Sequence, residues 1–171
     1  MGMDVYGNKP TSEVGKYFRA NVWWWRPLAN YIQHAAPEIA AKCQYWHSND
    51  GDGLGVKNAK ALATRLLETI ENGEAEAYVK EYTDRISALP LETCTICNGT
   101  GIRTDDVGVK AGWPEMLITE EGHPRHGQKG SCNSCAGRGT VPHWDTYYHL
   151  NVDTIREFAL FAKDSGGFKI L

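Results

Sequence analysis

The residues best suited to chemistry are four cysteines that occur in two copies of one short phrase. The first copy reads Cys94-Thr-Ile-Cys97-Asn-Gly99-Thr-Gly101 and the second reads Cys132-Asn-Ser-Cys135-Ala-Gly137-Arg-Gly139. A Cys-x-x-Cys pair can direct two thiolates at one ion, and two such pairs supply the four ligands of a closed tetrahedral zinc site. The glycines suit a chain that turns back around a metal, because glycine tolerates positive φ. We therefore predict one zinc ion per chain, bound by Cys94, Cys97, Cys132 and Cys135.

The phrase Cys-x-x-Cys-x-Gly-x-Gly resembles the cysteine-rich zinc repeat of the DnaJ (Hsp40) co-chaperones. The match covers only the two copies, which is fewer repeats than that family typically carries. The J-domain signature His-Pro-Asp is missing, since the only His-Pro pair is followed by Arg125. The resemblance therefore implies the four metal ligands and a zinc-ribbon-like subdomain, but it does not imply co-chaperone activity.

The whole chain also resembles small uncharacterised proteins encoded by bacteriophages and prophages. The shared phrases include Met-Gly-x-Asp-Val-Tyr-Gly7, Asn21-Val-Trp-Trp-Trp-Arg-Pro27, the two cysteine repeats and Asp164-Ser-Gly-Gly-Phe168. This resemblance implies an accessory protein that acts on host or phage machinery in the cytoplasm of the bacterial host. The sequence has no apolar run of membrane-spanning length and no apolar signal-peptide core at its amino terminus, so we expect no membrane association.

A second polar concentration contains His47, Asp50 and Asp52. The histidine could act as a general base oriented by a carboxylate, or the three could hold a divalent metal, which would make the protein a hydrolase. An EF-hand counted from Ser48 fails, because Ala59 stands where the bidentate glutamate is required. The alternative is a Gly/Asp-rich turn that leads into the next helix.

A third candidate is the aromatic stretch Trp23, Trp24, Trp25 and Arg26. These side chains could form a platform on which a base or another planar ligand stacks. The alternative interpretation is that they fill the core, with the arginine reaching to solvent. Three consecutive tryptophans cannot all face one side of a helix or strand, so at least one should point away from the main core.

The charge balance bears on the partner. The chain carries 18 basic and 21 acidic residues, a net charge of -3, which gives no general attraction to nucleic acid. Residues 90–143 contain five basic groups and six acidic ones, and a zinc ion held by four thiolates would add two negative charges. Nucleic-acid or nucleotide binding through Trp23–Arg26 and the zinc subdomain remains an alternative only if Arg103, Arg125, Lys129 and Arg138 form a patch.

Hydrophobic periodicity predicts an α+β fold with a mainly helical core and short strands. A short strand and turn are expected in residues 1–10, followed by a helical turn capped by Thr11 or Ser12. Helices are expected from Pro27, from Pro37, over 56–72, over 74–88 and from a cap at Asn151. The aromatic run in 141–150 should be extended and packed against the first half, and Cys43 should be a buried small hydrophobe.

Because the last helix follows the cysteine repeats, residues 1–90 and 144–171 are predicted to share one core. Residues 91–143 then form an inserted zinc-binding subdomain with a long loop, 98–131, whose two ends the metal fixes. The interpretation that we favour is a non-enzymatic, zinc-braced protein that engages a host or defence protein. The partner-binding residues predicted in this loop are Trp113, Met116, Leu117, Ile118, His123, Arg125 and His126.

Overall fold

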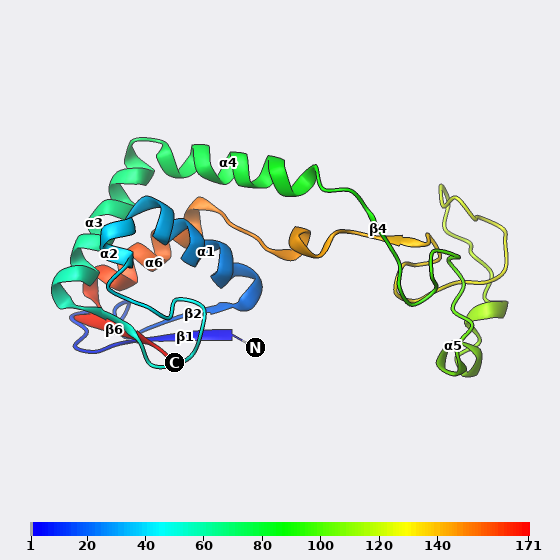
Figure 1. Cartoon of the computed structure of the whole chain (residues 1–171), viewed down its shortest axis with the longest axis horizontal. Helices are drawn as coiled ribbons and strands as arrows, with labels where there is room; N and C mark the ends of the chain where they lie inside the picture. The colour runs from blue at the N-terminus through cyan, green and yellow to red at the C-terminus, as the bar shows by residue number, and fades with distance from the viewer. Residues whose placement is uncertain (1) are drawn as a thin grey trace. The chain divides into compact units, whose positions relative to one another are not determined.

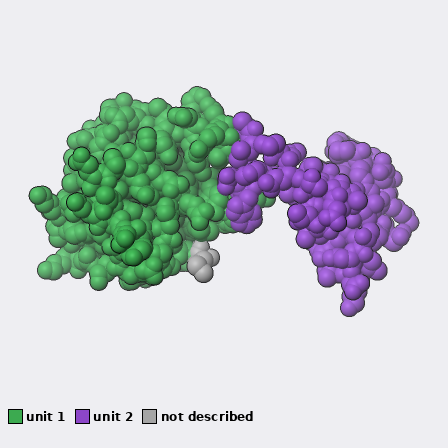
Figure 2. All heavy atoms as spheres, in the orientation of Figure 1, with its two compact units in different colours: residues 1–87, 147–171 green, residues 88–146 purple. Residues whose placement is uncertain are grey.

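The computed structural model describes residues 2–171, and over these residues it is an α+β fold with six α-helices and short antiparallel strands, which confirms the predicted class. The chain forms two compact units (Figure 2). Unit 1 combines the residues up to Ser87 with Tyr147–Leu171, and unit 2 is Ala88–Thr146. The cysteine repeats lie wholly in unit 2.

Unit 1 contains a four-stranded antiparallel sheet in the order β2-β1-β6-β3. The strands are β1 (Gly2–Gly7), β2 (Tyr17–Asn21), β3 (Gly53–Gly55) and β6 (Gly167–Ile170). Val5 in the central strand β1 pairs with Phe18 of β2 on one side and with Ile170 of β6 on the other. The helices of unit 1 lie on one face of this sheet (Figure 1).

The strand in residues 1–10 is confirmed, and the turn predicted after Thr11 or Ser12 is present as a single turn that no helix follows. The Ser12 hydroxyl accepts the Gly15 amide at 3.4 Å, and the Glu13 carbonyl accepts the Lys16 amide at 3.2 Å. Residues 8–16 form a loop that packs on the end of the last helix, where the Ser12 hydroxyl donates to the Asp164 carboxylate. The contact is close, because a Cβ on Gly15 would lie 2.2 Å from the Asp164 carbonyl oxygen. Ser12 therefore both caps the local turn and bonds a distant partner in the last helix.

Helix α1 (Val22–Ala35) begins five residues before Pro27, so the predicted start at that proline is wrong. The Asn21 side chain accepts hydrogen bonds from the amides of Trp23 and Trp24, and this cap sets the start of the helix. Pro27 lies inside the helix and has no amide hydrogen to donate to the Trp23 carbonyl. That carbonyl accepts the amide of His149 instead, at 2.9 Å. This bond joins α1 to residues 147–151, the segment with which the chain re-enters unit 1 and which we call the return segment.

The remaining helices of unit 1 are close to their predicted positions. They are α2 (Pro37–Ala40), α3 (Val56–Glu71), α4 (Glu74–Ser87) and α6 (Val152–Asp164), the last capped by the predicted Asn151. The large, fully buried side chains of this unit include Trp25, Tyr31, Leu62, Phe158 and Phe161. Cys43 is buried in the same core, as predicted, and burial raises the pKa of its thiol to about 12.

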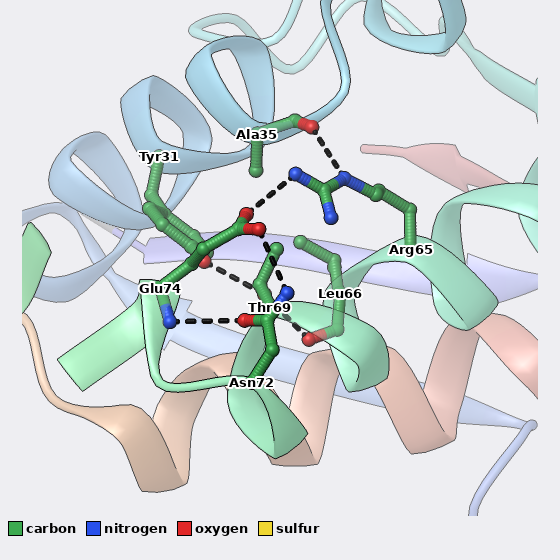
Figure 3. A network of polar contacts seen from close by, with 7 residues as sticks. All are labelled: Tyr31, Ala35, Arg65, Leu66, Thr69, Asn72 and Glu74. Carbon is green, nitrogen blue, oxygen red and sulfur yellow. Dashed lines mark hydrogen bonds and ion pairs between the residues drawn. The ribbon is translucent and has the colours of Figure 1, made fainter. Parts of the chain in front are cut away.

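A polar network fastens the turn between α3 and α4 to the end of α1 (Figure 3). Arg65 donates to the Ala35 carbonyl and to the Glu74 carboxylate, and Asn72 bonds the same carboxylate. Next to it, the buried Tyr31 hydroxyl donates to Thr69 at 2.8 Å. These bonds hold three helices of unit 1 together without any residue from unit 2.

Unit 2 has little regular structure. Strands β4 (Glu92–Thr93) and β5 (Thr140–Val141) pair and bring the two cysteine repeats together. Between the repeats lie a short helix, α5 (Asp106–Lys110), and a 3-10 turn, η1 (Trp113–Glu115), while η2 (Trp144–Tyr147) follows β5. None of the helices between residues 2 and 171 has the length and apolar character that crossing a membrane requires.

Candidate metal centre

The four cysteines of the two repeats converge in unit 2 on a single point. All four side chains are buried, and their sulfur atoms lie within 4.8 Å of one another. The Sγ–Sγ distances are 4.0 Å between Cys94 and Cys132 and 3.8 Å between Cys97 and Cys135. Sulfurs bound tetrahedrally to zinc at a normal bond length are about 3.8 Å apart. Four buried thiols with this spacing can coordinate one metal ion.

The two repeats fold as equivalent turns, which we call the first knuckle (residues 94–101) and the second knuckle (residues 132–139). In each, the amide two residues after the second cysteine donates to the carbonyl of the first cysteine. The amide of Gly101 donates to the Cys97 sulfur at 3.3 Å, and that of Gly139 donates to the Cys135 sulfur at 3.2 Å. Such bonds stabilise negative charge on the sulfurs, as metal ligation requires.

Glycine is required in both knuckles because the backbone enters the left-handed region. Gly99, Gly101, Gly137 and Gly139 all have φ between 73° and 82°. The knuckles also approach each other closely: a Cβ on Gly101 would lie 2.3 Å from the Gly137 oxygen, and one on Gly139 would lie 2.3 Å from the Gly99 oxygen. The glycine phasing in the sequence therefore reflects both turn geometry and contact between the knuckles.

The thiols differ in their tendency to ionise before a metal binds. Burial raises the pKa of Cys135 to about 11. Burial also opposes ionisation of Cys94, but the amides of Cys97 and Ile96 donate to its sulfur and lower its pKa to about 6. A cation would therefore have to displace protons from the cluster on binding, and acid should oppose its binding.

The predicted apolar residues of the loop have different environments. Ile118 is buried, Trp113 is half-buried, and Met116 and Leu117 are 49% and 51% exposed. The backbone around them is ordered by bonds to the segment that leads into the second knuckle: Gly130 donates to Met116 and Ser131 donates to Trp113. The loop thus holds two apolar side chains in solvent on a fixed backbone.

The predicted partner residues His123 and Arg125 bond within unit 2. His123 is buried, and its Nε2 lies 2.8 Å from the Ala136 carbonyl oxygen in the second knuckle. The Arg125 guanidinium donates to carbonyls of both knuckles, at Gly101 and Gly137. His126 is exposed, and its ring contacts the Glu120 carbonyl. Spacing along the sequence gave no signal of these contacts with the knuckles.

The basic residues near the cysteines do not form an unpaired cationic patch. Arg103 pairs with Asp105, Lys129 with Glu115, and Arg138 with Glu120. Arg125 is directed at backbone carbonyls. The condition under which nucleic-acid binding by this unit remained an alternative is therefore not met by these four residues.

The residues of the predicted stacking platform divide between the core and the return segment of unit 1. Trp25 is buried and donates to the Trp46 carbonyl. Trp23 and Trp24 are half-buried, and their rings contact residues 147–149 with centroid distances of 5.1 to 5.7 Å. Arg26 lies over the Tyr148 ring at 5.5 Å. Residues 147–149 of the predicted aromatic run therefore pack against the first half of the chain. The expectation that the whole run is extended is wrong, because Trp144–Tyr147 form a 3-10 turn.

The three residues of the hydrolase hypothesis have separate partners. Asp52 accepts the amides of Gln44 and Tyr45, Asp50 bonds Ser48, and the His47 ring contacts Gln33. Burial opposes the ionisation of Asp52, but three backbone amides outweigh it and lower its pKa. Burial, helped by Arg26, lowers the pKa of His47. Within residues 2–171 the group placed to hold a metal is the four cysteines.

No family model, curated protein or solved structure matches the chain. The comparisons therefore support neither the resemblance to the DnaJ repeat nor the relation to phage proteins. The functional argument rests on the cysteine cluster and on the loop between its two halves.

Proposed function

We propose that this protein is a non-enzymatic, zinc-braced binding protein whose residues 98–131 present a surface to a protein partner. Four buried thiols form a soft donor set that suits zinc and completes its tetrahedron, so one zinc ion per chain would be structural. The resemblance of the sequence to phage proteins further suggests that this partner is a host or defence protein in the bacterial cytoplasm.

The observation that carries the proposal is the exposure of apolar side chains on the loop between the knuckles. Val107 and Val109 are 58% and 60% exposed, and Met116 and Leu117 are about as exposed. All four lie between Cys97 and Cys132, on backbone that local hydrogen bonds hold in place. Apolar groups held in solvent on an ordered backbone are typical of an interaction surface.

Charge favours a protein partner over nucleic acid. The basic side chains near the cysteines are occupied by carboxylates or carbonyls, and zinc held by four thiolates adds negative charge. A phosphate backbone would be repelled by this unit, whereas an apolar segment flanked by lysine or arginine would suit it.

The test uses the zinc-loaded full chain, immobilised and exposed to a bacterial lysate after nuclease treatment. Proteins that it retains should be lost with the double variant Met116→Ser/Leu117→Ser, because that variant removes two exposed apolar contacts while leaving the backbone bonds intact. Leu91→Ser is the matched control: Leu91 is 66% exposed in unit 2 but lies outside the loop, so retention should continue.

Two results would contradict the proposal. Equal retention by the double variant and the wild type would remove the loop from the interface. Retention that disappears with nuclease and weakens steeply with salt would indicate nucleic-acid binding instead.

A further inference from the structure

We propose that Arg125 transmits metal occupancy to the apolar segment Met116–Ile118, so that the loop presents its exposed Met116 and Leu117 only when the metal is bound. The inference rests on the proposed function, because it describes how the same surface would be regulated. It assigns to Arg125 a positioning role inside unit 2 in place of the direct partner contact that the sequence suggested.

Arg125 joins three separate parts of unit 2 through one guanidinium group. Its Nη1 donates to the Gly101 carbonyl of the first knuckle at 3.1 Å and to the Gly137 carbonyl of the second knuckle at 3.5 Å. Its Nη2 donates to the Lys129 carbonyl at 2.9 Å. A planar fork of donors suits this arrangement of carbonyls, and charged donors make the stronger hydrogen bonds.

The backbone at Arg125 is itself held against the second knuckle. The Arg125 amide donates to Nδ1 of His123 at 3.0 Å, and the other ring nitrogen of that histidine lies 2.8 Å from the Ala136 oxygen. His123 is only 5% exposed, so little water competes for these bonds. Both the side chain and the backbone of Arg125 are therefore placed by the knuckles.

The Gly101 and Gly137 carbonyls lie within reach of Arg125 because the two knuckles are in contact. Gly101 and Gly137 are both at positive φ, and the two knuckles approach within contact distance at these residues. Two of the four sulfurs come from each knuckle, so a metal bound to all four would hold the knuckles together. Removing the metal should therefore separate the knuckles and move the Gly101 and Gly137 carbonyls apart.

Unit 2 has little apolar core to hold it together without the metal. Among its described residues the buried apolar side chains are the four cysteines and Ile118. Ile118 also depends on the second knuckle, since its Cδ1 would lie 2.9 Å from a Cβ on Gly137. A small unit with so little core relies on its metal for folding free energy.

The path from Arg125 to the surface is short. Lys129, whose carbonyl Arg125 binds, pairs with Leu117 in an antiparallel bridge. The bonds on either side of this bridge run from Gly130 to Met116 and from Ile118 to Gln128, at 2.9 and 3.0 Å. If Arg125 no longer binds the Lys129 carbonyl, residues 128–130 can move. The hydrogen bonds that order the backbone of Met116 and Leu117 would then be lost.

The test is amide hydrogen exchange on the full chain, with and without zinc, for the wild type, Arg125→Ala and Arg138→Ala. Arg138 is the matched control, because it is an arginine of the second knuckle whose side chain pairs with the Glu120 carboxylate at the surface. Zinc per chain is measured on the same samples.

With zinc bound, Arg125→Ala should retain the metal but exchange the amides of residues 116–118 and 128–130 about tenfold faster or more, since charged hydrogen bonds are lost. Arg138→Ala should match the wild type. Without zinc, all three proteins should exchange these amides equally fast, while unit 1 stays protected.

The inference is overturned if Arg125→Ala exchanges like the zinc-loaded wild type, if it loses its zinc, or if the metal-free wild type keeps these amides protected. These results need no partner, so they are separate from failure of the proposed function, which would show as loss of binding specificity while the exchange pattern remained as expected.

Discussion

Gly101 and Gly139 show how single residues shape the metal centre. Each donates its amide to a cysteine sulfur and adopts positive φ. A Cβ added to either residue would lie 2.3 Å from a carbonyl oxygen of the other knuckle. Three requirements therefore meet at one position, and only a residue without a side chain satisfies them together. The cluster depends on these glycines almost as directly as on its sulfurs.

We expect Gly101→Ala to weaken metal binding by about tenfold to a hundredfold, the range seen when groups that support metal ligands are altered. The control is Gly112→Ala, because Gly112 also has positive φ, at 74°, but has open space around it. Competition with a chromophoric zinc chelator measures both affinities. Equal affinities for the two variants would show that contact between the knuckles is unimportant.

The sequence predicted the residues of this centre better than the residues around it. The cysteines could be identified because the spacing of a metal knuckle is local and is visible in one short phrase. The role of Arg125 could not, because its carbonyl partners at Gly101, Gly137 and Lys129 come together only after unit 2 has folded. Of the three residues in the hydrolase hypothesis, Asp50 and Asp52 bond nearby residues of the same loop, whereas His47 contacts Gln33 of α1.

At the scale of elements, α1 shows two local signals in competition. Pro27 suggested a helix start, but Asn21 caps a helix that contains Pro27 in its interior. Because Pro27 has no amide hydrogen, the Trp23 carbonyl has no donor within the helix, and it accepts the amide of His149 instead. A missing helix bond is thus replaced by a long-range one. Strands β2 and β6 were not predicted, because short strands are defined by their partners more than by their own residues.

Asn21→Ala should lower the free energy of unfolding of unit 1 by about 1 kcal/mol, because two helix amides lose their acceptor. Asn30→Ala is the control: Asn30 is exposed within the same helix, so its replacement should leave stability unchanged or slightly higher. Urea denaturation followed by tryptophan fluorescence checks both. A cost for Asn30→Ala equal to that of Asn21→Ala would argue against the cap.

At the scale of the molecule, the two units are stabilised by different physics. Unit 1 has an extensive apolar core that brings together residues from distant parts of the chain, such as Val5, Leu62 and Phe158. Unit 2 has a core made chiefly of four cysteines. Periodicity predicted the helices of unit 1, whereas the ordered course of residues 98–131 has no periodic signal and depends on turns and side-chain contacts.

This difference gives the metal a defined place in the molecule. Unit 1 should fold with or without it, and unit 2 should need it. Cys43 provides an internal comparison, because it is a buried cysteine of unit 1 that lies outside the metal cluster.

The most direct test of the account is the zinc content of the purified full chain, measured by elemental analysis on the wild type, Cys132→Ser and Cys43→Ala. Four thiolates that close one tetrahedral site predict about one zinc per chain in the wild type and in Cys43→Ala, and a strong loss in Cys132→Ser. A wild-type protein that folds fully without bound metal, or a Cys132→Ser variant with undiminished zinc, would contradict the central claim.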